Sequence, residues 1–167
     1  MTDRQVPREA RLLSMMQSQC SRQELCRNDI RRRLEKRGAE PAVIERIIEQ
    51  LCKDRFLDEE RYAGAYIRDK IRFQGWGPAK VSGMLRIKGI PDDVIQEALS
   101  VTDQTLFEEN LKDALLRKNK TIKEADSRKR YAKLVRFGLG KGYGYQQVAR
   151  CLGRLKILES GEIFFAE

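Results

Sequence analysis

The chain has 167 residues, enough for one compact domain or a short array of small units. It carries 34 lysines and arginines against 25 aspartates and glutamates, and the net charge of +9 suits a partner with an acidic surface, most simply nucleic acid. No histidine is present, which excludes Ser-His and Cys-His nucleophile pairs and every zinc site that requires imidazole.

The cysteines and the absence of apolar segments indicate the compartment. None of the four cysteines belongs to a C-x-x-C pair, so they do not fit a four-thiolate zinc site, and we expect reduced, mostly buried thiols at Cys20, Cys26, Cys52 and Cys151. The opening MTDRQVPREAR is charged where a signal peptide needs an apolar segment, and no apolar run reaches membrane-spanning length. We therefore expect a cytoplasmic protein with no membrane partner.

Three glycines divide the sequence into repeats. Gly38, Gly89 and Gly142 each end a basic segment, at spacings of 51 and 53 residues. After each glycine, apolar residues recur at i, i+1, i+4 and i+5, which lines one face of an α-helix. The pattern reads Val43, Ile44, Ile47 and Ile48, then Val94, Ile95, Ala98 and Leu99, then Val148, Ala149, Leu152 and Gly153.

The first repeat is predicted to hold three helices. The first contains ARLLSMMQ, with Leu12, Leu13 and Met16 on one side. The second starts at SRQE, where Ser21 can cap the helix and Glu24 can reach back in a capping box. The third opens with Pro41, a favoured first-turn residue, and runs to about Lys53.

The second and third repeats follow the same plan. Asp58 caps a helix that leads to the corner GWGP, the segment GPAKVSGMLRIKG forms the next helix, and Pro91 starts the last. In the third repeat, apolar positions from Leu106 to Leu115 mark a helix, and a polar link at residues 120–126 precedes the next.

These elements predict an all-α fold, an elongated tandem array of three three-helix repeats with about nine helices. Only the C-terminal GEIFFAE resembles a strand. The predicted organisation is a flexible N-terminus at 1–7, repeats at 8–56, 57–101 and 102–155, and a C-terminal tail at 156–167.

The corner GWGP contains the only tryptophan of the chain. Gly75 is placed to end a helix, and Pro78 pre-sets the first turn of the next one. Trp76 has two interpretations. It packs over the helix ends, or it stacks on a base at the mouth of a basic groove, since cations flank it at Arg68, Arg72 and Lys80.

Charge occurs in blocks along the chain. Residues 61–90 hold seven basic and one acidic group, whereas residues 91–110 hold six acidic groups and no basic one. Acidic residues at helix N-termini explain the negative blocks but not basic runs such as RRRLEKR and SRKRYAKLVR. We therefore predict a nucleic-acid-binding surface that includes Arg31, Arg32, Arg68, Arg72, Lys80, Arg86, Lys88, Arg128, Lys129 and Lys133.

Catalytic and cofactor motifs are not found. GLGKGYG at 138–144 lacks the G-x-x-x-x-G-K-[ST] pattern and follows no strand, so it does not predict nucleotide binding. The carboxylate pairs Glu59–Glu60 and Glu108–Glu109 are sequence neighbours that point in different directions on a helix, which does not suit a two-metal site. We predict a binding protein with no catalytic residues, no metal and no cofactor.

A stretch in the middle of the chain resembles a known family. Residues 56–90, FLDEERYAGAYIRDKIRFQGWGPAKVSGMLRIKGI, are similar to the central signature of RecX proteins, bacterial regulators of the RecA recombinase. The matching positions are Leu57-Asp58, Arg61-Tyr62, Tyr66-Ile67-Arg68, Gly75, Gly77-Pro78, Leu85 and Lys88-Gly89-Ile90.

The resemblance implies a monomer that binds RecA filaments on single-stranded DNA. Such a protein modulates, and mostly inhibits, filament extension and the recombinase and ATPase activity, in DNA repair and recombination. Two alternatives stay open from the residues alone. One is a double-stranded DNA-binding regulator that uses the GWGP corner as a helix-turn-helix, and the other is a metal-dependent nuclease, which the absent histidine disfavours.

Overall fold

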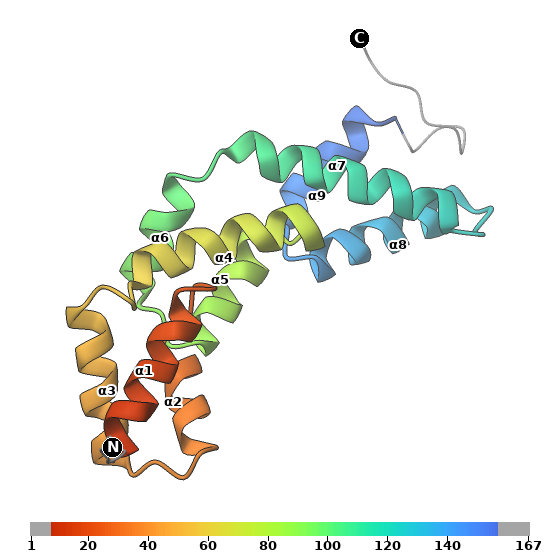
Figure 1. Cartoon of the computed structure of the whole chain (residues 1–167). Coiled ribbons are helices and arrows are strands. Elements are labelled where there is room, and N and C mark those ends of the chain that lie inside the picture. The colour runs from red at the N-terminus through yellow and green to blue at the C-terminus, as the bar shows by residue number, and fades with distance from the viewer. Residues whose placement is uncertain (1–7, 157–167) are drawn as a thin grey trace, which may run out of the picture. The chain divides into compact units, whose positions relative to one another are not determined.

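The computed structural model describes residues 8–156, and every regular element in that range is an α-helix (Figure 1). The predicted all-α class is therefore confirmed for the described part. The strand-like GEIFFAE and the N-terminal residues 1–7 lie outside it. The helices are α1 (Arg8–Cys20), α2 (Arg27–Glu35), α3 (Pro41–Lys53), α4 (Glu59–Gln74), α5 (Pro78–Ile87), α6 (Asp92–Ser100), α7 (Gln104–Thr121), α8 (Ser127–Gly140) and α9 (Tyr145–Arg154).

The described chain divides into two compact units. Unit 1 contains residues 8–65 and 85–98, and unit 2 contains residues 66–84 and 99–156. Helices α4, α5 and α6 therefore contribute to both units. The repeat boundaries and the elongated arrangement expected from the sequence stay predictions.

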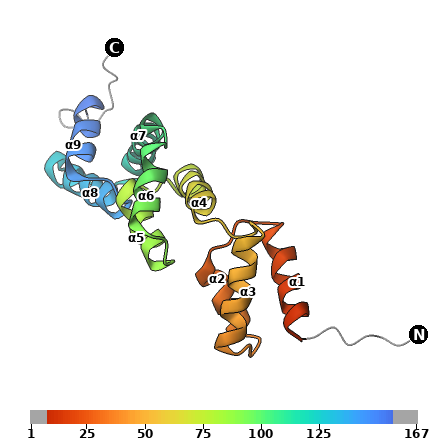
Figure 2. The same ribbon diagram turned by 90° about the vertical axis from the view of Figure 1, so that its left-hand side faces the viewer.

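Unit 1 is built around the first three helices, with α3 packed against both α1 and α2 (Figure 2). Their apolar faces meet in one core, because residues at helical spacing come together on one side of each helix. Isoleucine and leucine dominate this core, which comprises Leu12, Met16, Leu25, Ile30, Leu34, Ile44, Ile47, Ile48, Leu51 and Leu57.

The start of α2 differs from its prediction. Ser21 does not cap α2, since its hydroxyl donates to the carbonyl of Gln17 (3.0 Å) at the end of α1. The cap is instead Cys26, whose backbone N–H and thiol both donate to the carboxylate of Asp29 (3.4 and 3.2 Å). The prediction was wrong by five residues because a second capping-box pattern, C-R-N-D, stands where the apolar spacing of the helix begins.

The three glycines that define the repeats end helices as predicted. Gly38, Gly89 and Gly142 have φ angles of +67°, +81° and +93°, which only glycine adopts without strain. In each case the next residue donates its N–H to the carbonyl five positions back, at 3.1, 3.1 and 3.2 Å, the long bond of a Schellman motif. The repetition of this geometry explains the repetition in the sequence.

Unit 2 contains a closed three-helix group, because α7, α8 and α9 all contact one another. Gly138 permits the close approach of α8 and α9, since a Cβ there would lie 2.6 Å from a methyl group of Val148. The link between α7 and α8 is held by Arg130, which donates to the carbonyl of Glu124 (2.6 Å) and to the buried Asn119 (3.3 Å). The end of α4 and the start of α5 belong to the same unit.

Candidate nucleic-acid interface

The GWGP corner is held against the turn between α8 and α9. Gly77 donates its N–H to the carbonyl of Lys141 (2.7 Å), and Ala79 donates to the carbonyl of Gly142 (3.1 Å). A Cβ on Gly77 would lie 2.5 Å from the carbonyl oxygen of Gly142, so no larger residue fits here without a shift of the backbone. The two glycine-rich segments of the sequence therefore form one backbone contact within unit 2.

Two lysines reinforce this contact reciprocally. The ammonium of Lys141 donates to the carbonyl of Gln74 (3.0 Å), the last residue of α4. The ammonium of Lys80 donates to the carbonyl of Gly140 (3.2 Å), the last residue of α8. Each cation thus meets unpaired carbonyls at the negative end of a helix dipole. These lysines align the ends of α4 and α8.

Trp76 lies half-buried at this corner. Its backbone N–H donates to the carbonyl of Lys70 (3.1 Å), after the left-handed Gly75 (φ +60°) has ended α4. Its ring lies 5.0 Å from the ammonium of Lys70 and 4.9 Å from that of Lys80, within the range of cation–π attraction. This environment favours the packing interpretation, and both interpretations stay predictions.

A basic and aromatic groove lies beside this corner. It encloses about 380 Å³ between the end of α4, the second half of α7 and the end of α8. Its lining holds four cations and two phenylalanines, and among the described residues it contains no carboxylate. The lining residues are Arg72, Phe73, Gln74, Gly75, Asn110, Ala114, Arg117, Lys118, Thr121, Phe137 and Lys141.

The two aromatic rings of the groove suit stacking. Phe73 is 76% exposed, so most of its ring surface is open to a ligand. The ring of Phe137 lies 5.6 Å from the ammonium groups of both Lys118 and Lys141. Cations beside exposed aromatic faces are the combination by which proteins bind single-stranded nucleic acid, since phosphates meet the cations and bases meet the rings.

Of the ten cations predicted from the sequence, six lie in unit 2, but only Arg72 lines this groove. Arg68 is exposed one turn earlier on α4. Arg128 and Lys129 are exposed in the first turn of α8, and Lys133 pairs with Glu124 (3.0 Å). The ammonium of Lys80 donates to the carbonyl of Gly140 at the end of α8.

The other four predicted cations lie in unit 1. Arg31 pairs with Glu45 (2.9 Å), Arg86 pairs with Asp92 (2.6 Å), and Arg32 is exposed. Lys88 has the most contacts of the four, because its ammonium lies 2.9 Å from a carboxylate oxygen of Asp29 and 5.7 Å from the centre of the Tyr62 ring. A phosphate would have to displace these contacts at three of the four residues.

The carboxylate of Asp29 organises this cluster in unit 1. Besides Lys88, it accepts from the thiol of Cys26 and from the hydroxyl of Tyr62 (3.5 Å). Burial raises the pKa of Asp29, but the hydrogen bonds from Lys88 and Cys26 together outweigh it, so that the pKa falls below its usual value. Through Asp29 and Lys88, the cluster joins the start of α2 to the end of α5.

Sequence reasoning missed five of the charged and aromatic residues of the groove, namely Phe73, Arg117, Lys118, Phe137 and Lys141. Phe73 follows Arg72 on α4, whereas the other four come from α7 and from the end of α8, and no local pattern joins those four to α4. One signal was available, since the dipeptide Arg-Phe precedes a glycine-rich turn twice, at 72–73 and at 136–137. A phenylalanine that follows an arginine near both helix ends, exposed at Phe73 and half-buried at Phe137, indicates a shared aromatic site.

The thiols show no sign of reactivity. All four cysteines are free, with Cys26 buried and the other three half-buried. Burial is the largest influence on each thiol and raises the pKa of all four, which keeps them protonated at neutral pH.

Among residues 8–156, no three cysteine or carboxylate side chains gather as a metal site would require. Within the same range, no helix combines the length and the apolar character that crossing a membrane demands.

The fold is that of a protein built from three-helix domains, and its candidate functional surface is the basic and aromatic groove of unit 2. The models of the second and third three-helix domains of RecX match residues 58–99 and 108–152. A RecX regulatory protein of Vibrio parahaemolyticus is 33% identical over 124 residues, which span 74% of this chain and 78% of that protein. The chain belongs to the RecX family. The family membership predicted from the sequence is confirmed.

Other relatives extend the comparison. The RecX protein of Clostridium botulinum is 36% identical over 118 residues, or 70% of this chain, and the chain spans only about half the length (55%) of that relative. A crystal structure of regulatory protein RecX matches with a TM-score of 0.79 at 24% identity, over 87% of this chain and 71% of that one. RecX from Lactobacillus salivarius matches with a TM-score of 0.77 at 20% identity, over 89% and 97%. The structural matches confirm the fold.

Proposed function

We propose that the chain binds RecA filaments on single-stranded DNA and modulates, mostly by inhibition, their extension and their recombinase and ATPase activity, in DNA repair and recombination. It acts in the cytoplasm as a monomer. Family membership supports a regulatory role. The observation that carries the DNA part of the proposal is the groove of unit 2, in which four cations and two phenylalanines line one cavity with no carboxylate among the described lining residues.

The groove suits a single strand better than a duplex. Phosphates are attracted by Arg72, Arg117, Lys118 and Lys141 around the cavity, and the absence of carboxylates there removes the usual repulsion. An exposed ring such as Phe73 gains free energy by stacking only on a base whose face is free. Bases in a duplex already stack on one another, so the aromatic part of the groove selects unpaired strands.

The double-stranded DNA alternative gains no support from the corner. A helix-turn-helix places the N-terminal residues of its second helix on base edges in the major groove. Here the first residues of the corresponding helix, α5, are held by the turn between α8 and α9, through the N–H groups of Gly77 and Ala79. Their hydrogen bonds and the close approach at Gly142 occupy the surface that such a contact would need.

Co-sedimentation tests the proposal. The full chain is incubated with RecA filaments on single-stranded DNA in the presence of ATP, and in parallel with the DNA alone, over a range of salt concentrations. The double variant Arg72→Gln, Arg117→Gln removes two groove cations. Each phosphate contact on a single strand contributes about 0.7 to the log–log salt slope, so this variant is expected to flatten the slope by about 1.4.

A charge-matched control separates the groove from general basicity. Arg136→Gln with Lys120→Gln removes two exposed cations of the same unit that do not line the groove. We expect this control to keep the slope of the wild-type chain, and both double variants to keep their helical content by circular dichroism. Equal slopes for the groove variant and the control would refute the groove, and the absence of any wild-type binding to filaments would refute the proposed function itself.

A further inference from the structure

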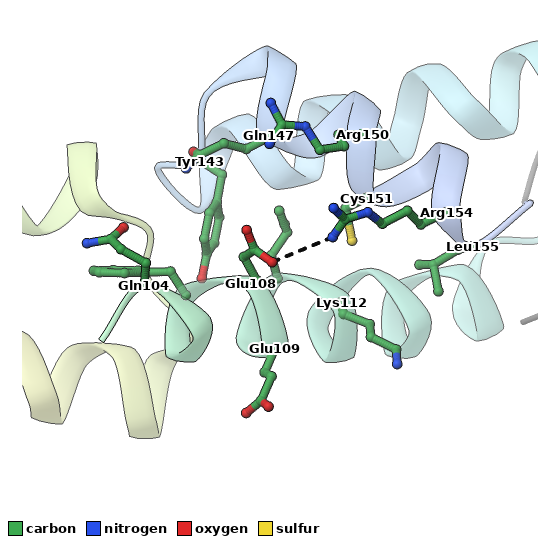
Figure 3. Close-up of a pocket in the computed structure, with 12 residues that line it drawn as sticks. Gln104, Glu108, Glu109, Lys112, Tyr143, Gln147, Arg150, Cys151, Arg154 and Leu155 are labelled. Atoms are coloured by element: carbon green, nitrogen blue, oxygen red, sulfur yellow. Dashed lines mark ion pairs between the residues drawn. The ribbon is translucent and has the colours of Figure 1, made fainter. Parts of the chain in front are cut away.

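A second cavity of unit 2 differs in character from the groove. It encloses about 400 Å³ between α7 and α9, and α9 supplies one wall while α7 supplies the other (Figure 3). Its apolar part consists of four buried side chains, each at most 3% exposed: Phe107, Leu111, Tyr143 and Leu155. The cavity is large enough for the side chain of a bound polypeptide and the adjacent backbone.

The hydroxyl of Tyr143 lacks a hydrogen-bond partner among the described residues, although it is shielded from solvent. The ring extends from the turn before α9 toward α7 (Figure 3). Burial raises the pKa of Tyr143 to about 12, so the group stays protonated at neutral pH and can donate. Buried polar groups in native proteins are nearly always paired, because an unpaired one loses its bond to water without compensation. This hydroxyl is therefore suited to an acceptor that a ligand brings.

Charges of both signs surround the mouth of the cavity. Arg150 and Arg154 come from α9, and Glu108, Glu109 and Lys112 come from α7. Glu108 faces Arg154, whereas Glu109 and Lys112 project from α7 away from α9 (Figure 3). Glu108 and Arg154 face each other at 3.6 Å, and both side chains are about two-thirds exposed. An ion pair this exposed contributes little to stability, so it opens readily when other charges approach.

This combination fits a polypeptide and not a nucleic acid. Two of the five charged residues in its lining are carboxylates, and they weaken the attraction of a phosphate, whereas no carboxylate lines the groove of α4, α7 and α8. An apolar floor accepts an aliphatic or aromatic side chain, and a backbone carbonyl next to that side chain can accept from Tyr143. The two arginines of α9 complement an acidic residue of the same segment.

We propose that this cavity holds the protein component of the filament, through a RecA segment that inserts one apolar side chain, offers a carbonyl to Tyr143 and places an acidic side chain at Arg150. This inference rests on the proposed function and assigns its two binding partners to two different sites of unit 2. The groove binds the DNA strand, and the cavity between α7 and α9 binds the recombinase.

Tyr143→Phe is the sharpest test, because it removes one oxygen and keeps the ring. Loss of a hydrogen bond in a desolvated contact is expected to weaken filament binding roughly 3- to 10-fold. The melting temperature of the free chain is expected to be unchanged or higher, since the lost hydroxyl was unpaired. Tyr145→Phe is the matched control, because Tyr145 follows two residues later, is 58% exposed and does not line the cavity.

A second variant reports on the mouth of the cavity. Arg150→Glu, at an exposed position, is expected to weaken filament binding at least 10-fold, with partial rescue by Arg150→Lys, which restores the charge. Binding of Tyr143→Phe to single-stranded DNA alone is expected to equal that of the wild-type chain. Loss confined to filaments supports a recombinase contact, and equal loss on DNA alone overturns it.

The remaining outcomes are also decisive. Unchanged filament binding by Tyr143→Phe, with wild-type binding intact, overturns the inference and leaves the proposed function standing. A lower melting temperature of Tyr143→Phe with unchanged filament binding shows that the hydroxyl is paired inside the free chain, by water or by residues 157–167, and also overturns it. Failure of the wild-type chain to bind filaments refutes both.

Discussion

Replacement of Gly77 by alanine tests the contact on which the candidate interface depends. The added Cβ would lie 2.5 Å from the carbonyl oxygen of Gly142, 2.6 Å from its carbon and 2.7 Å from the nitrogen of Tyr143. All three are backbone atoms, so relief requires one turn to move away from the other. Overpacking of this kind costs about 1–3 kcal/mol, and loss of the hydrogen bond to Lys141 adds about 0.5–1.5 kcal/mol.

A total of about 2–4 kcal/mol is expected to lower the melting temperature of Gly77→Ala by roughly 5–15 °C, at about 2–4 °C per kcal/mol for a chain of this size. Trp76 is the natural probe, because it is the only tryptophan and precedes Gly77 in unit 2. Thermal unfolding is followed by its fluorescence and, in parallel, by circular dichroism. Coincident transitions would show that the two units unfold together, and separate transitions would show that they unfold independently.

The matched control lies six residues further on. Gly83 is inside α5, and a Cβ there meets no atom within 4 Å. Gly83→Ala is expected to stabilise the chain by about 0.5–1 kcal/mol, because alanine is the better helix former. The two Gly→Ala changes therefore have opposite signs. A melting temperature of Gly77→Ala within about 1 °C of the wild-type value would refute the backbone contact between the corner and the turn.

Two further predictions concern single side chains. Trp76→Ala is expected to lower the thermal stability of unit 2 while the folded fraction keeps its filament affinity; preserved stability with a binding loss of about 1–3 kcal/mol would establish stacking instead. Asp29→Asn is expected to destabilise the chain most at neutral pH. Because the pKa of Asp29 is lowered in the folded state, its contribution is full above its ordinary pKa of about 3.9 and is lost as pH falls through the folded value. The difference in melting temperature should shrink below about pH 4, and a constant difference from pH 7 to pH 3 would contradict this account.

Local signals in the sequence predicted the helices well where one residue type has a single physical use. Pro41 and Pro78 begin α3 and α5, and Asp58 accepts from the N–H of Arg61 (2.9 Å) at the start of α4. Ser21 failed because two capping-box patterns compete within a few residues. The choice between them depends on Leu25 and Cys26 being buried, which only packing decides.

The candidate interface was predictable only in part. Arg72 was identified because it stands in a basic block beside an unusual glycine-rich corner. Lys88 belongs to a similar block, yet its ammonium is paired with Asp29, 59 residues earlier in the chain. A cation available to a ligand and a cation in an internal ion pair have the same sequence signature, since the partner comes from a distant segment.

The sequence by itself determined where the helices end and that they repeat, because a left-handed turn needs glycine and an amphipathic helix needs apolar residues at fixed spacing. The net charge predicted an acidic partner, and the absence of histidine excluded every catalytic or zinc site that requires imidazole. Only the tertiary structure decided which side chains share a surface. The end of α4 meets α7 and α8 because Gly77 and Gly142 let two turns approach within hydrogen-bonding distance, a contact between segments 65 residues apart that leaves no periodic trace in the chain.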